Sequence, residues 1–152
     1  MSKSILSMTL STVALMAALP GVGTTTPAPA VSANVEQCVT ATAQSGRSVT
    51  FTGQMETLPG AHRMAMEIIV QEHDPGETGF HTLAAAGPAT WQRSEVGLKI
   101  YKYVRQVTDL PAPAAFRALV QYRWLDERDH VLRTTSRRTP ICRQPAATMP
   151  GA

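Results

Sequence analysis

The chain has 152 residues, enough for one domain with its own core but too few for two domains of ordinary size. Its formal net charge is only +3, and charged residues make up 16% of it, which is not the strong, clustered basic excess of a nucleic-acid-binding protein. We therefore expect a single domain whose partners do not include nucleic acid.

The first 33 residues indicate a secretory signal peptide followed by a short linker. Lys3 supplies a positive charge, and residues 5–19 form an apolar run of small and branched side chains. This run is shorter than the roughly 20 residues of a membrane-spanning helix, so we expect no membrane span after signal cleavage. Two small-residue motifs leave cleavage open between Ala30 and Ala33. Either site predicts a secreted, extracellular protein.

Residues 34–143 show strand-like alternation, divided by turn residues at short intervals. We expect strands at 38–43, 48–55, 64–70, 80–86 and 100–107, with turns at 44–47, 58–60 and 74–79. Trp91 falls in a further short segment between breaks. Both faces of 100–107 carry apolar side chains, so two registers stay open for that strand. Residues 144–152 are expected to form a disordered tail.

The most regular alternation runs from Phe116 to Trp124. Apolar side chains occupy the even positions, and Arg117, Gln121 and Arg123 lie at odd positions. A helix would need a sustained 3.6-residue period, so this pattern predicts a strand with one buried face. Many short strands with frequent turns predict an all-β fold, a single antiparallel β-sandwich of about seven strands.

The stretch TDLPAPAAF, immediately before that strand, resembles the E–F corner of fibronectin type III and related immunoglobulin-like domains. The family pattern runs Leu-x-Pro-x-x-x-Tyr, and Leu110 and Phe116 have the spacing of its leucine and tyrosine. Here the prolines stand at 111 and 113, and Phe116 has no hydroxyl. The resemblance implies a secreted immunoglobulin-like sandwich whose chain crosses between sheets at this corner. It does not imply an activity, because such folds carry many functions.

The two cysteines, Cys38 and Cys142, bracket the β-rich region. In an oxidising compartment this placement predicts a disulfide that closes most of the domain into one loop. Metal ligation by the two thiolates is the alternative, but no CxxC motif accompanies them.

Arginines gather in the last predicted strand. Arg133 and Arg137 share one face of it, whereas Arg138 points to the other. Guanidinium groups suit carboxylate and phosphate partners, so these arginines, together with Trp91, are a candidate surface for an anionic glycan or a protein at the cell surface. The alternative is an edge strand protected by charge.

Two histidines flank one turn and invite a metal site. His73 and His81 bracket residues 74–79, and Glu72 or Asp74 could add oxygen ligands. Surface-loop histidines are the simpler interpretation, and we predict no metal, no cofactor and no catalytic residues. The sequence thus predicts a secreted, non-enzymatic binding or adhesion module at or outside a bacterial surface. The alternative is a small secreted hydrolase or metal-binding protein that uses these loop histidines and acids.

Overall fold

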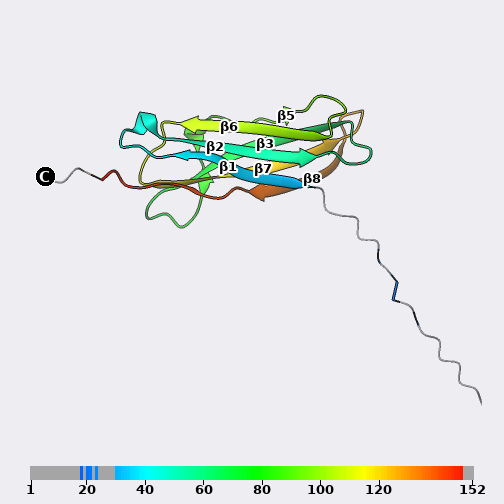
Figure 1. Cartoon of the computed structure of the whole chain (residues 1–152), viewed down its shortest axis with the longest axis horizontal. Helices are drawn as coiled ribbons and strands as arrows, with labels where there is room; N and C mark the ends of the chain where they lie inside the picture. Colours follow the sequence, from blue (N-terminus) through cyan, green and yellow to red (C-terminus); the bar gives the residue numbers. More distant parts are fainter. Residues whose placement is uncertain (1–17, 19, 22, 24–29, 149–152) are drawn as a thin grey trace, which may run out of the picture.

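The computed structural model describes residues 18, 20–21, 23 and 30–148, and strands dominate what it describes (Figure 1). The strands are β1 (Val31–Val39), β2 (Ser48–Glu56), β3 (Arg63–His73), β4 (His81–Thr82), β5 (Gln92–Arg93), β6 (Ile100–Thr108), β7 (Ala114–Leu125), β8 (Val131–Arg138) and β9 (Cys142–Gln144). Two 3-10 turns, η1 (Gln44–Gly46) and η2 (Ala84–Ala86), lie in the connections. Within the described part of the chain no helix is long and apolar enough to cross a bilayer.

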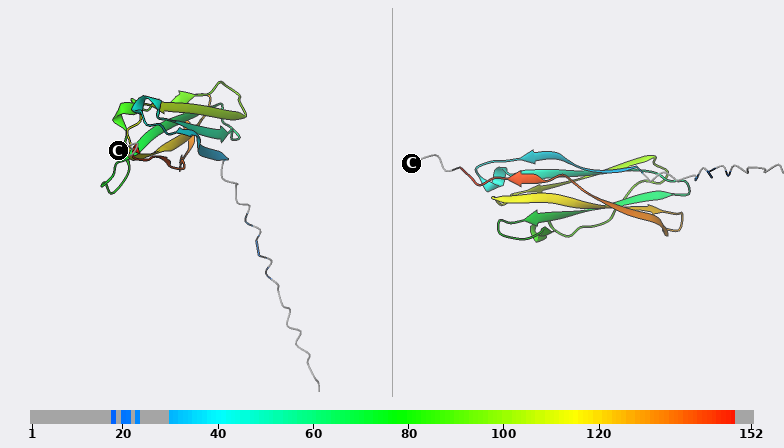
Figure 2. Two further views of the ribbon diagram at one scale, coloured as in Figure 1. Left: turned by 60° about the vertical axis from the view of Figure 1, so that its left-hand side comes forward. Right: turned by 90° about the horizontal axis from the view of Figure 1, so that it is seen from below.

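Two antiparallel sheets pack face to face, which confirms the predicted all-β sandwich (Figure 2). The three-stranded sheet has the order β1-β2-β6. The six-stranded sheet has the order β4-β3-β7-β8, with β5 also paired to β3 and β9 to β7. The chain passes from the first sheet to the second between β6 and β7, where the sequence predicted a crossover.

The core follows from the alternation in the sequence. Every even-numbered side chain of β7 from Phe116 to Trp124 is fully buried, and it faces apolar side chains of β2 such as Phe51. Gly53 of β2 leaves room for the opposite sheet, because a Cβ there would clash with the sulfur of Met66. The inner layers of the two sheets therefore interlock without a gap at this position.

The polar tips of the two largest core aromatics bond to the opposite sheet. Tyr122 donates its hydroxyl to the carbonyl of Ser32 at 2.7 Å. Trp124 donates its indole N–H to the carbonyl of Glu56, also at 2.7 Å. A buried N–H or O–H without a partner is costly, so these two bonds allow large amphipathic side chains to fill the centre.

The predicted disulfide is present. Cys38 of β1 and Cys142 of β9 are bonded, with their Cα atoms 5.6 Å apart and 104 positions apart in sequence. The bond therefore links an edge of the three-stranded sheet to the six-stranded sheet.

Several predicted boundaries differ from the structure. β1 begins at Val31, inside the predicted linker, and it ends at Val39 rather than at residue 43. Residues 80–86 are not one strand: only His81–Thr82 pair with β3, and the alanines that follow form η2. Gln144, assigned to the disordered tail, is buried in β9. The predicted signal sequence lies almost wholly outside the described residues.

The open register of residues 100–107 is resolved by the pairing of β6 with β2. Tyr101 lies opposite Met55 and Tyr103 opposite Gly53, so the odd-numbered side chains face inward. Arg105 follows them inward and donates to the carbonyl oxygens of Ile68 and Ala86 at 2.6 Å each. Ile68 lies on β3 between the residues that pair with β4 and those that pair with β5. By bonding to its carbonyl, Arg105 links β6 to the opposite sheet.

Candidate functional site

The outer face of the six-stranded sheet carries an arginine cluster. Because opposite residues of an antiparallel pair point to the same side, the register places Arg117, Arg123 and Arg138 on the face turned away from the core. Arg117 lies opposite Gln71 of β3, and Arg138 lies opposite Leu119 of β7. We call these three arginines the outer arginine cluster.

Two loop aromatics fold over this face and stack on the arginines. The ring of Phe80 lies 3.9 Å from the guanidinium carbon of Arg117, and the ring of Trp91 lies 3.8 Å from that of Arg123. Arg117 also donates from its Nε to the side-chain oxygen of Gln71 at 2.9 Å. Stacking on a ring holds a guanidinium in position and leaves its in-plane N–H groups free to donate.

A shallow groove of about 410 Å³ lies beside Trp91. Its lining residues come from the loop before β5 and from β7 and β8: Trp91, Gln121, Tyr122, Arg123, Thr134, Thr135 and Ser136. Side-chain amide and hydroxyl groups can both donate and accept hydrogen bonds, and the guanidinium only donates. The groove therefore offers a polar wall with one fixed positive charge.

Charge on this face is poorly compensated. Partial burial, and secondarily the proximity of Arg138, lower the pKa of Arg117 from its ordinary value. Among the arginines of the described residues, Arg93 alone approaches a carboxylate within 4.0 Å, that of Asp129 at 2.9 Å. Glu67 faces the same side from β3 and is half-buried, but no cation of the described residues lies within that distance of its carboxylate. The outer arginine cluster thus keeps its positive charge available to a ligand.

The four residues predicted to form a binding surface do not lie together. Trp91 lines the groove and Arg138 belongs to the outer face. Arg133 and Arg137 are paired with Trp124 and Val120, which face the core, so they lie on the inner side of β8 at the open edge of the sandwich. All three arginines of β8 are exposed.

Sequence reasoning missed Arg117, Arg123 and Phe80 as candidate site residues. Arg117 and Arg123 are six positions apart, an even spacing that puts them on one face of a strand. That signal was visible in the sequence, but it does not reveal that β8 lies alongside or that two loops fold over the face.

The histidine candidates are also separated. The carboxylates of Glu72 and Asp74 and the ring of His81 place one ligand atom each within 4.8 Å of one another. His73 is not part of this group, and its Nε2 lies 2.8 Å from the backbone carbonyl of Glu77. Burial raises the pKa of Glu72, and the neighbouring carboxylate of Asp74 raises that pKa further.

Comparison with known proteins assigns no family to the chain. No family model matches it, and no curated protein matches it significantly. One similar solved structure is Bacteroides uniformis beta-glucuronidase 2 covalently bound to cyclophellitol-6-carboxylate aziridine. The match has 13% sequence identity and a TM-score of 0.36, and it covers 72% of this chain and 12% of that enzyme. The chain therefore spans a small part of the enzyme's length.

Proposed function

We propose that this chain is an exported, non-enzymatic binding module with an immunoglobulin-like sandwich, and that it binds an anionic glycan outside the cell. The strand order supports the fold assignment. In an immunoglobulin-type sandwich, strands A, B and E share one sheet and strands C, F and G the other. Here β1, β2 and β6 take the first set of places, and β3, β7 and β8 take the second. The short β4 beside β3 takes the place of C′.

Two features depart from the family pattern. The disulfide joins β1 to β9, whereas antibody domains join strands B and F. Phe116, at the place of the corner tyrosine, has no hydroxyl to bond the corner backbone. The proposal therefore rests on the strand order and on the burial of Leu110 and Phe116, which are 1% and 0% exposed.

Export is supported by the disulfide and by the apolar N-terminal run. Structural disulfides persist in oxidising compartments and are rare where thiols are kept reduced. Cys142 is fully buried, so the bond belongs to the packed domain rather than to a reactive surface pair.

The observation that carries the ligand proposal is the outer arginine cluster without carboxylate partners, next to the groove beside Trp91. Guanidinium groups bind carboxylates and sulfates through paired hydrogen bonds. Gln121, Thr134 and Ser136 supply the donors and acceptors that sugar hydroxyls need. A flat sheet face with spaced positive charges suits an extended acidic polysaccharide better than a small deeply enclosed ligand.

The test is retention of the full chain on immobilised polygalacturonate compared with neutral dextran. We expect retention on the acidic polymer at low salt and elution as salt rises, because exposed charges are screened. Two triple variants, each with three positive charges removed, then show whether binding depends on this face or only on the net charge of the chain. The cluster variant is Arg117→Gln, Arg123→Gln, Arg138→Gln, and the control variant is Lys99→Gln, Lys102→Gln, Arg128→Gln.

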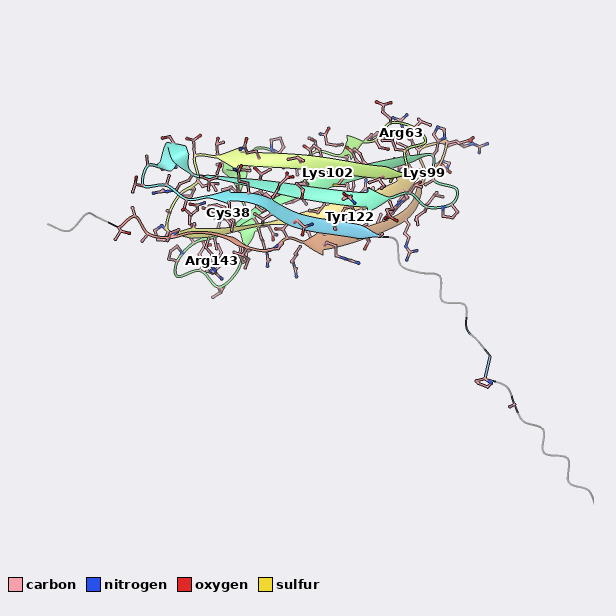
Figure 3. All side chains as sticks on the ribbon, viewed as in Figure 1. Cys38, Arg63, Lys99, Lys102, Tyr122 and Arg143 are labelled. Atoms are coloured by element: carbon pink, nitrogen blue, oxygen red, sulfur yellow. A yellow bond between two sulfur atoms is a disulfide. The ribbon has the colours of Figure 1, made fainter. Side chains whose placement is uncertain are left out.

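Lys102 lies on β6 of the three-stranded sheet, opposite Gln54 of β2 (Figure 3). Lys99, Lys102 and Arg128 are not among the residues that line the groove. We expect the control variant to be retained and the cluster variant to pass through the column. Equal behaviour of the two variants would show that net charge alone is responsible. Failure of the unaltered chain to bind the acidic polymer would overturn the glycan proposal.

A further inference from the structure

Three potential metal ligands meet at the hairpin between β3 and β4. Glu72 near the end of β3 lies directly opposite His81 at the start of β4, so their side chains point to the same side. Asp74 follows in the turn, and its carboxylate completes a set whose ligand atoms all lie within 4.8 Å of one another. We call Glu72, Asp74 and His81 the hairpin triad.

The imidazole of His81 is held between two carboxylates. Its Nε2 faces Glu72 at 3.7 Å, and its Nδ1 lies 2.9 Å from the carboxylate of Glu77. A histidine that ligates a metal through one ring nitrogen commonly donates its other N–H to a carboxylate, which fixes the tautomer and the ring orientation. Glu77 is positioned for that role because its backbone N–H bonds to the carbonyl of Asp74 at 3.1 Å.

The burial of Glu72 is a second indication. Its side chain is only 8% exposed, and the side chain that lies close enough to share a hydrogen bond with it is a second acid, Asp74. Its nearest cationic partner is His81 itself, at 3.7 Å, and the carboxylates of Asp74 and Glu77 crowd the same space. Burying a carboxylate among other carboxylates is costly, and a bound cation would compensate their charge.

We propose that the hairpin triad binds one divalent transition-metal ion of the zinc type, with Glu77 orienting His81. Ligands of a tetrahedral zinc ion with bonds of 2.0–2.2 Å lie about 3.4 Å apart, close to the separation of Glu72 and His81. One imidazole with two carboxylates favours zinc over calcium or magnesium, which prefer oxygen ligands alone. Three protein ligands leave the fourth position open to water or to a ligand group.

The test is calorimetric titration of the full, disulfide-bonded chain after treatment with a chelator. We expect one Zn²⁺ ion to bind per chain, no binding of Ca²⁺ at the same concentrations, and a higher melting temperature with zinc, because a ligand that binds only the folded state stabilises it. His81→Gln and Glu72→Gln should each abolish the stoichiometric zinc binding. Glu77→Gln should weaken it about 10–100-fold, as loss of an orienting carboxylate does.

His130 supplies the matched control. It also lies against a carboxylate, with its Nδ1 3.2 Å from Asp126, but it is outside the hairpin triad. His130→Gln should keep full zinc binding. Absence of stoichiometric binding to the unaltered chain would overturn the proposal, as would unchanged binding in His81→Gln or an equal loss in His130→Gln. Circular dichroism of each variant confirms that it is folded.

Arg117 contacts this hairpin, because its guanidinium stacks on Phe80 and its Nε donates to Gln71, whereas Arg123 pairs with Ala65 at the other end of β3. The single variant Arg123→Gln should therefore bind zinc as the unaltered chain does while being retained less strongly on the acidic polymer, so failure of one proposal leaves the other standing.

Discussion

Arg47 is a buried arginine whose guanidinium bonds to backbone carbonyls. It is 7% exposed and donates to Ala41 and Thr42 at 2.8 Å each, and to Leu110 at 3.4 Å. The backbone N–H of Leu110 returns a bond to the carbonyl of Arg47 at 3.4 Å. Arg47 thus ties the η1 turn to the crossover between the sheets.

Arg47→Met should therefore destabilise the fold strongly. Methionine fills part of the volume but leaves buried carbonyls without their charged donors, and hydrogen bonds to charged groups contribute about 1.5–3 kcal/mol each. We expect a loss of about 3 kcal/mol in the free energy of unfolding, measured by urea denaturation. Arg133→Met, at an exposed edge position, is the control and should change stability by less than about 0.5 kcal/mol. Similar values for the two variants would contradict this role for Arg47.

Single residues also show how far the sequence predicts burial. The alternation identified the buried side chains of β7, because a strand with one wet face has only two sides. It placed Arg47 in a turn, where an arginine is ordinarily solvated. Only the three-dimensional fold shows that this turn closes over the crossover, so the burial of Arg47 was not predictable from local pattern.

At the level of elements, the arginines of β8 also show what local sequence pattern does not predict. Alternation separated Arg138 from Arg133 and Arg137, and the structure agrees with that separation. Alternation alone does not say which side faces the core, and it does not say which strand is the neighbour. The outer arginine cluster is assembled by pairing β7 with β8, a long-range feature that local pattern does not encode.

β1 is the element whose start bears on the proposed cleavage of a signal peptide. Its second residue is tied to the opposite sheet, because the Ser32 carbonyl accepts the Tyr122 hydroxyl at 2.7 Å. Burial raises the pKa of Tyr122 above its ordinary value, so this hydroxyl stays protonated and remains a donor. Cleavage after Ala33 would remove its acceptor together with part of β1.

We therefore predict that the proposed signal cleavage falls after Ala30, so that the mature chain begins at Val31 and β1 stays whole. N-terminal sequencing of the exported protein distinguishes Val31 from Asn34. A chain made to begin at Asn34 should melt at a lower temperature than one that begins at Val31, because a buried hydroxyl without a partner costs about 1–3 kcal/mol. A mature chain that starts at Asn34 and melts at the same temperature as the longer one would show that the first residues of β1 are dispensable.

For the whole molecule, the two sheets are joined by a shared apolar core and by a few specific links across it. The hydroxyl of Tyr122 and the indole of Trp124 link them in the interior, and Arg105 links them along the β3 edge. The disulfide is the covalent link, between β1 and β9. Its position was predictable because the sequence has only two cysteines, and these bracket the strands.

Reduction of the Cys38–Cys142 bond should lower stability by a large fraction of the total. Closing a loop of about 100 residues in the unfolded chain contributes at most about 4.7 kcal/mol, and measured values are typically about 2–4 kcal/mol. Against a typical domain stability of about 5–15 kcal/mol, we expect a clear fall in the urea midpoint after reduction. The double variant Cys38→Ala, Cys142→Ala should lose most of the same stability without any reductant, which separates loss of the bond from effects of the reductant. Because Cys142 is fully buried whereas Cys38 is exposed, the double variant also loses a little packing and should be the less stable of the two by a small margin. An unchanged midpoint after complete reduction would show that the non-covalent links between the sheets hold the domain by themselves.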